Sequence, residues 1–175
     1  MSAPAAPGTP GADPEHFRAA MARFASGVVI ATTLDADGQP RGFTASAFCS
    51  VSLAPPLVLV CLGRAAECHA AFLAAERMAI SILAPGQDEV ARRFATRGAD
   101  KFGGGHMVAA DDGLPVVRHA AAVLRGRLAE RLPGGDHTIL LMAVEGVLLA
   151  GDAEAALVHH ARRFWSLGAG LGQTQ

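Results

Sequence analysis

Several residue types and features are scarce or missing in this chain of 175 residues, and each absence excludes a class of protein. The three cysteines have no CxxC spacing, so neither a disulfide framework nor a zinc ribbon is expected. The formal net charge is −1, which gives no basic field of the kind that attracts nucleic acid. No apolar run is long enough to span a bilayer. We therefore expect a cytoplasmic protein with reduced thiols and with neither nucleic acid nor a membrane as partner.

Motifs of several common enzyme classes are also missing. No GxGxxG follows the first predicted strand, which argues against a Rossmann dinucleotide site, and there is no GxxxxGK phosphate loop. HExxH is absent, and neither Cys68-His69 nor His159-His160 has a third ligand at metal spacing, so no metal centre is expected. No serine lies in a GxSxG context. With no tyrosine and one tryptophan, few rings are available to stack on a flat ligand.

The composition favours one domain that associates with other chains. Hydrophobic residues make up 51% of the chain and charged residues 18%, which suggests extra apolar surface buried in an oligomer. Residues 1–13 are rich in Ala, Pro and Gly without a hydrophobic stretch, so they predict a disordered tail and not a signal peptide. The remaining length, residues 14–170, suits a single domain with its own core.

The hydrophobic pattern predicts a mainly β protein with a few helices. Short hairpins join most of the six or seven expected strands, which favours a closed or nearly closed antiparallel barrel over a doubly wound sheet. Residues 103–117 are expected to be irregular, and residues 156–168 to run from a strand into a helical turn. Strands are expected over 27–34, 41–52, 57–63, 78–83 and 138–150 (with a kink at Gly146), and helices over 13–26, 65–77 and within 85–102. Residues 119–132 fit a strand or a helix, and the surrounding strands favour a strand.

The stretch RGFTASAFCSVS, residues 41–52, carries more hydroxyls than a core strand needs. As one strand it would place Thr44, Ser46, Phe48 and Ser50 on one face, with small apolar residues on the other. One reading is an exposed edge strand with a polar outer face. The other is a ligand wall, in which hydroxyls and amides meet a flat polar ligand and small residues let the backbone approach it.

Two further segments have both a structural and a functional reading. The sequence GGDH, residues 134–137, is either a hairpin turn with a surface histidine or a turn that aims His137 at a ligand. The segment around FATRGADKF contains Arg92, Arg93, Arg97 and Lys101. These cations either form a solvated helix face balanced by nearby acids or hold a phosphate.

The order of these pieces resembles a known family more closely than any single piece does. GFTASAF, SVS and PPL come first, then RFA and ADKF, then GDH and the C-terminal RRFWSL. This order is similar to that of the flavin reductase family, and in particular of the reductase components of two-component flavin monooxygenases. The resemblance implies an FMN-binding split β-barrel, a Greek-key-like antiparallel barrel with a few helices, that usually forms homodimers with the flavin near the interface.

The resemblance also implies roles for individual residues. His137 would place the nicotinamide, and Ser46 with the neighbouring amides would stabilise charge on the reduced flavin. The backbone of Ala65 and Ala66 would bind an anion, although this segment lacks the family's usual hydroxyls and contains an acid, Glu67, which hints at an exchangeable flavin. Arg93, Phe94 and Lys101 would lie near the phosphate tail or at the dimer partner's side of the site. Residues near the flavin would be Ser26, Gly27, Val28, Val29, Gly42, Phe43, Thr44, Ala45, Ser46, Ser50 and Val51.

The implied activity is that of an NAD(P)H:flavin oxidoreductase. Hydride would pass from NADH or NADPH to FMN or FAD, and the reduced flavin would go to a partner monooxygenase. No general acid or base is required for hydride transfer, which agrees with a sequence without a catalytic triad. Two rivals stay open: a non-enzymatic flavin- or haem-binding split barrel with His137 or His159 as haem ligand, and an FMN-dependent oxidase of an organic substrate.

Overall fold

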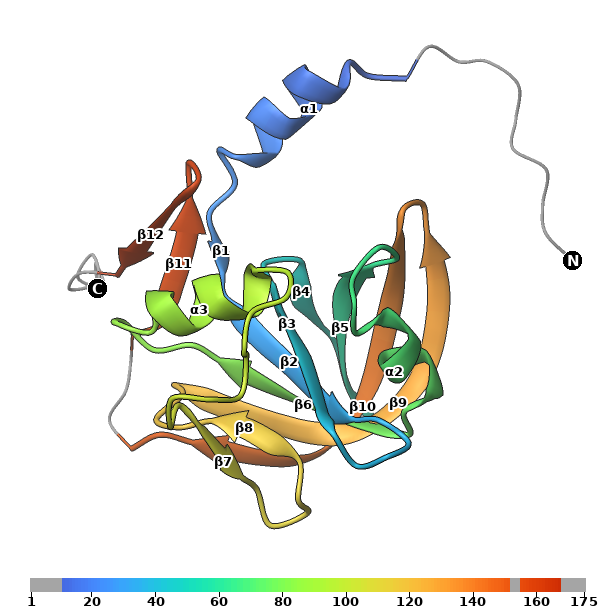
Figure 1. Cartoon of the computed structure of the whole chain (residues 1–175). Coiled ribbons are helices and arrows are strands. Elements are labelled where there is room, and N and C mark those ends of the chain that lie inside the picture. The colour runs from blue at the N-terminus through green and yellow to red at the C-terminus, as the bar shows by residue number, and fades with distance from the viewer. Residues whose placement is uncertain (1–10, 152–154, 168–175) are drawn as a thin grey trace, which may run out of the picture.

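The computed structural model describes residues 11–151 and 155–167, and in these ranges the chain forms three helices and twelve strands (Figure 1). Most of the predicted tail, and residues 168–170 of the predicted domain, lie outside the described residues. The main antiparallel sheet has seven strands in the order β3-β2-β6-β9-β10-β5-β4. Their bounds are β2 Val29–Leu34, β3 Pro40–Ala45, β4 Phe48–Leu53, β5 Pro56–Gly63, β6 Arg77–Ile82, β9 Ala122–Gly134 and β10 His137–Leu149.

The two edges of this sheet meet where β3 passes into β4. The edge strands are consecutive in the chain and are separated only by Ser46 and Ala47. The Cys61 amide donates to the Ala47 carbonyl at 3.0 Å, so the connection is fixed to the β5 side. The sheet therefore curls into a nearly closed barrel that is split between β3 and β4, as predicted. The expectation of one continuous strand over residues 41–52 is wrong, because each half pairs with a different neighbour.

Strand β2 is buried on both faces, which explains the continuous apolar run at its start. Val29 and Ala31 belong to a core cluster inside the curl, together with residues from β5, β6 and β10. Val28 and Ile30 point the other way, into a second cluster. That second cluster is covered by α3 (Asp88–Ala95) and by a small hairpin of β7 (Met107–Ala109) and β8 (Pro115–Val117). Residues 103–117 were expected to be irregular. That expectation is wrong in part, because these residues contain the β7–β8 hairpin.

The long β9–β10 hairpin forms the back of the barrel. Its register shifts twice, between Leu141 and Met142 and between Val144 and Gly146, so the predicted kink at Gly146 is confirmed. Gly126 on β9 faces the backbone of Ala143 so closely that an added Cβ would overlap with the carbonyl oxygen. The shifts and this close approach allow two thirteen-residue strands to bend with the sheet.

The predicted helix over residues 65–77 is much shorter than expected. In the structure α2 spans His69–Ala74, and Arg77 already belongs to β6, where it pairs with Arg127. Phe72 of α2 is fully buried and meets Phe43 edge-on, with ring centroids 5.1 Å apart. The helix therefore closes one end of the barrel, and the residues before it form a loop.

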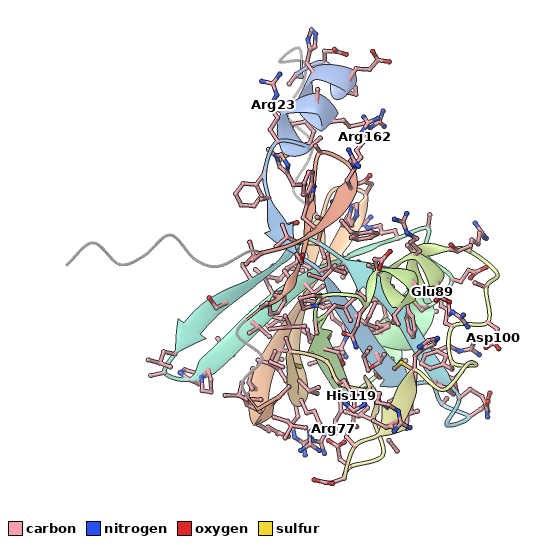
Figure 2. The ribbon with its side chains drawn as sticks, turned by 90° about the vertical axis from the view of Figure 1, so that its left-hand side faces the viewer. Arg23, Arg77, Glu89, Asp100, His119 and Arg162 are labelled. Atoms are coloured by element: carbon pink, nitrogen blue, oxygen red, sulfur yellow. The ribbon has the colours of Figure 1, made fainter. Side chains whose placement is uncertain are left out.

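Helix α1 (Pro14–Met21), capped by the Asp13 carboxylate, stands clear of the barrel (Figure 1). A three-stranded sheet of β1 (Ser26–Gly27), β11 (Leu157–His160) and β12 (Arg163–Ser166) packs on the barrel, with Leu157 buried in the second core cluster. Figure 2 shows Arg23 and Arg162 on this side of the molecule, away from Arg77 and His119. The predicted helical turn near the C-terminus is wrong, because these residues form the β11–β12 hairpin. No helix within the described ranges is long and apolar enough to cross a membrane.

Candidate functional site

A cavity of about 280 Å³ lies at the end of the barrel where β3, β5 and the start of β10 meet the loop before α2. Its wall includes residues from the segments RGFTASAFCSVS, FATRGADKF and GGDH. From the predicted set it contains Gly42, Phe43, Thr44, Ala65, Ala66, Phe94, Lys101 and His137. To these the structure adds Cys61, Leu62, Gly63, Glu67, Cys68, Ala95 and Arg97.

His137 is the first residue of β10 and faces Gly63, its partner on β5. The Nδ1 atom lies 2.7 Å from an oxygen of Asp136, which fixes the ring and leaves Nε2 toward Gly63. The hydrogen bond from His137 lowers the pKa of Asp136, so the carboxylate remains ionised as the partner of the imidazole. The GGDH turn therefore presents an oriented imidazole at the cavity wall, where it is half exposed.

The small residues of the wall serve two different purposes. At Gly63 an added Cβ would be 3.7 Å from Nε2 of His137, so the missing side chain leaves space in front of the imidazole. At Gly42 an added Cβ would lie 2.8 Å from the Phe94 ring and 2.9 Å from the Ala31 carbonyl oxygen. Gly42 thus permits close packing of α3 on β3, and its small size does not open space for a ligand.

Thr44 also has a structural contact. Its hydroxyl donates to the carbonyl oxygen of Ala91 at 2.6 Å, which ties β3 to α3. Toward a ligand this oxygen can therefore only accept a hydrogen bond, and its predicted role at a flavin edge stays a prediction. The hydrogen bond holds Phe94, the neighbouring aromatic residue of α3, against the cavity.

Replacing Thr44 with valine is expected to lower the free energy of unfolding by about 1 kcal/mol, because the Ala91 carbonyl loses its donor. Thermal or denaturant unfolding measures this loss. Thr96→Val is the matched control, because it removes an exposed hydroxyl-to-carbonyl bond to Arg92 and is expected to cost much less. If Thr44→Val left stability unchanged and weakened ligand binding at the cavity instead, the structural role of this hydroxyl would be refuted.

Two cations and one carboxylate lie together on another part of the wall. Glu67 is 3.5 Å from Lys101 Nζ and 3.4 Å from Arg97 Nε. It also accepts a hydrogen bond from the Gly98 amide at 3.2 Å. Of the nearby acids, Asp88 pairs with Arg92 and Glu89 with Arg93. At the cavity, the single negative charge of Glu67 is shared by Arg97 and Lys101.

A second, larger hollow of about 810 Å³ lies between α1 and the β4–β5 edge. Ser26 and Ser46, both predicted near the flavin, line this hollow and not the smaller cavity. The two spaces share Cys61, whose side chain is partly buried. The remainder of the wall is largely apolar and includes Phe17, Met21, Phe24, Phe48 and Leu59.

The other predicted residues line neither space. Val28, Val29 and Ala45 are buried in the core, so only their backbone could meet a ligand. Gly27, Ser50 and Val51 are exposed on β1 and β4. Arg93 binds Glu89 and the carbonyl oxygen of Gly103, at 3.0 and 3.4 Å.

The sequence reasoning missed Gly63, Leu62 and Cys61 as parts of the wall. Their position follows from the register between β5 and β10, which sets Gly63 opposite His137 and Cys61 opposite Ile139. The available signal for this part of the wall was Gly63, which ends a strand just before the loop RAAE. Arg97 was recognised as part of the basic segment. Its ion-pair partner Glu67 lies thirty residues earlier in the chain, and this pairing was not predicted.

The arrangement suits a flat polar ligand with an anionic tail. Small residues and an imidazole form one part of the wall, and Lys101 and Arg97 with Glu67 form another. The described residues contain no group of three His, Cys, Asp or Glu side chains that could hold a metal ion. His159, one of the histidines considered as a haem ligand, packs against Phe164 at 5.5 Å between ring centroids.

Comparison with known proteins agrees with this geometry. The model of the flavin reductase like domain matches residues 21–168. The NADH:riboflavin 5'-phosphate oxidoreductase of Streptomyces pristinaespiralis is 42% identical over 159 residues, covering 90% of each chain.

Two solved structures are similar in fold and sequence. The NADH:FAD oxidoreductase SgcE6 of Streptomyces globisporus C-1027, in complex with NAD and FAD fragments, has a TM-score of 0.83 and 34% identity, covering 90% of this chain and 94% of that one. BorF, the flavin reductase component of a bacterial two-component tryptophan halogenase, has a TM-score of 0.80 and 31% identity, covering 89% and 98%. The barrel, the cavity wall and these matches together show that the chain belongs to the flavin reductase family.

Proposed function

We propose that this protein is an NAD(P)H:flavin oxidoreductase that reduces FMN or FAD and releases the product to a flavin-dependent monooxygenase. The observation that carries the proposal is the single cavity that joins an oriented imidazole, a group of small residues and two cations. The similarity to an NADH:riboflavin 5'-phosphate oxidoreductase supports the reduction of flavin. The similarity to the reductase component of a two-component halogenase supports the release of reduced flavin to a second enzyme.

The residues present fit a flavin nucleotide. Gly63, Ala65 and Ala66 leave room for a flat ring, because none of them has a side chain beyond Cβ. Lys101 and Arg97 supply the charge that a phosphate requires, and the Gly98 amide adds a backbone donor. Phe43 and Phe94, which line the same cavity, provide apolar surface for the ring.

When bound together, the nicotinamide supplies a hydride from C4 and the flavin accepts it at N5. The protein contributes orientation and electrostatics. Asp136 holds the His137 ring so that Nε2 faces the cavity and can bind the polar edge of a nicotinamide nucleotide. The cavity wall would confine both rings, so that the hydride donor and acceptor would not have to meet by free diffusion. Ser46, at the split, is proposed to act on charge that develops on the reduced flavin.

The direct test follows NADH and NADPH oxidation at 340 nm with FMN, FAD, riboflavin or no flavin. We expect oxidation that depends on both an added flavin and the protein. A coupled assay with a flavin-dependent monooxygenase, with catalase present to remove peroxide, reports whether the reduced flavin is usable by a second protein. No oxidation under any combination would refute the proposal, and a haem Soret band without oxidation would favour the carrier reading.

We further propose that the working form is a homodimer in which a second copy covers the larger hollow. Helix α1 buries none of its residues, and Phe17, Met21 and Phe24 are 58%, 53% and 72% exposed. An apolar helix face beside an apolar hollow is costly to leave in water. Ser26 and Ser46 also line this hollow, so a partner chain there would complete the wall around the flavin.

Replacing Phe17 with aspartate is expected to raise the dimer dissociation constant by about thirtyfold or more, as for a central apolar anchor worth about 2 kcal/mol. Sedimentation or light scattering at several concentrations measures the change. Ala19→Asp puts the same charge on the same helix but outside the hollow, and is expected to leave the dimer intact. A Phe17→Asp protein with the mass of the unaltered one at every concentration would contradict the proposed interface.

A further inference from the structure

Glu67 is the residue of the cavity wall whose role the proposed reaction does not explain. Its carboxylate accepts a hydrogen bond from the Gly98 amide at 3.2 Å. The same carboxylate lies 3.5 Å from Lys101 Nζ and 3.4 Å from Arg97 Nε. An amide, an ammonium and a guanidinium are the donors that phosphate oxygens prefer. In this protein the Glu67 carboxylate already contacts all three of these donors.

Other features of the wall make this occupation significant. The Lys101 side chain is only 16% exposed, so it has limited freedom to leave Glu67 for another anion. Glu67, Cys68 and Lys101 also line an adjoining cavity of about 220 Å³, with Arg41 and Phe102. The Glu67–Lys101 pair therefore lies on the wall common to both spaces, where the tail of a nucleotide would leave the ring site.

The Glu67 carboxylate is ionised at neutral pH, where a flavin phosphate is also charged. The hydrogen bond from the Gly98 amide, with further contributions from Lys101 and Arg97, lowers the pKa of Glu67. A phosphate that approaches these donors is repelled by the negative charge of Glu67. It can bind the donors only by displacing the Glu67 carboxylate from them.

We propose that Glu67 acts as an internal anion that competes with the flavin phosphate for Lys101, Arg97 and the Gly98 amide, and so sets the selectivity between phosphorylated and unphosphorylated flavins. The inference rests on the proposed function, because it assumes that the cavity binds flavin. It assigns a specificity-determining role: Glu67 weakens binding of FMN and leaves riboflavin, which has no phosphate, unaffected. Weak retention of FMN favours its release after reduction.

Replacing Glu67 with glutamine tests this role with little change in shape. The glutamine oxygen can still accept the Gly98 amide, while Lys101 and Arg97 lose their counter-charge. We expect FMN to bind roughly tenfold more tightly, the size of effect of one charge-assisted hydrogen bond. Riboflavin affinity is expected to stay within twofold. Quenching of flavin fluorescence, titrated without nicotinamide nucleotide, measures both constants independently of turnover.

Salt and a matched variant complete the experiment. The Glu67→Gln protein is expected to show a steeper loss of FMN affinity with added salt, since its cations are free to bind phosphate. Asp88→Asn removes a charge that pairs with Arg92 outside both cavities, and it should leave both flavin constants unchanged. Weaker FMN binding by Glu67→Gln, or an equal change for FMN and riboflavin, would overturn this inference alone. Failure of the unaltered protein to bind any flavin would instead overturn the proposed function on which it rests.

Discussion

Replacing Gly63 with leucine is expected to lower kcat/KM for flavin reduction by about a hundredfold while the protein still folds. The first side-chain carbon at this position meets only Nε2 and Cδ2 of His137, at 3.7 and 4.0 Å, which are ordinary contact distances. The rest of a leucine side chain must extend into a cavity of only about 280 Å³. It would occupy the space in front of the imidazole, where the flavin and nicotinamide rings must be placed together.

The size of the added group gives the internal control. Gly63→Ala adds a single carbon and is expected to reduce kcat/KM severalfold at most, with unfolding curves for both variants close to that of the unaltered protein. Steady-state NADH oxidation and flavin fluorescence quenching are measured on all three. A leucine variant that folds and retains activity within threefold would show that the cavity at Gly63 is not the reaction site.

The barrel class was predictable in part because β2 is buried on both faces. Val28 to Ala31 supply alternate side chains to the two core clusters, so the apolar run at β2 identified a covered strand without any knowledge of its neighbours. The break at Ser46 and Ala47 was not predictable in the same way. The alternation across residues 41–52 continues through the break, and only closure of the sheet sends one half to β2 and the other to β5.

Two other errors have local physical causes. The alanine-rich segment 65–77 has high helix propensity, but the loop before α2 is held by tertiary contacts, among them Glu67 with Gly98. The β11–β12 hairpin turns through Ala161 and Arg162, with φ of 50° and 61°. Turns of this kind usually contain asparagine or glycine, so neither residue signalled a hairpin.

The candidate site was only partly accessible from sequence for a related reason. Motif order identified Lys101, Phe94 and His137, which the fold brings into one cavity. The same reasoning assigned the hydroxyl of Thr44 and the small size of Gly42 to the ligand, whereas both support the packing of α3. A residue type shows what a side chain can do, but the strand register decides which partner it meets.

His137→Ala is expected to lower kcat/KM for NADH by tenfold to a hundredfold, the loss of about 1.5–3 kcal/mol for a hydrogen bond that involves a charged or strongly polar partner. The flavin dissociation constant should change by less than twofold, since the imidazole is held by Asp136 at the part of the wall away from the Glu67 contacts. Stopped-flow measurement of flavin reduction over a range of NADH concentrations separates a weaker nicotinamide complex from a slower hydride transfer.

Two comparisons decide whether the effect belongs to the position of the imidazole. His106→Ala removes a partly buried histidine outside the cavity and is expected to leave the kinetics unchanged. Asp136→Asn keeps an oxygen that can accept from Nδ1 but removes the charge that orients the ring, so a smaller loss is expected. If His137→Ala weakened flavin binding as much as it lowered kcat/KM for NADH, the imidazole would be a flavin ligand and not the group that places the nicotinamide. Unchanged kinetics would show that His137 has no role in the site. Orientation of the nicotinamide would then depend on Gly63 and the neighbouring residues of the cavity wall alone.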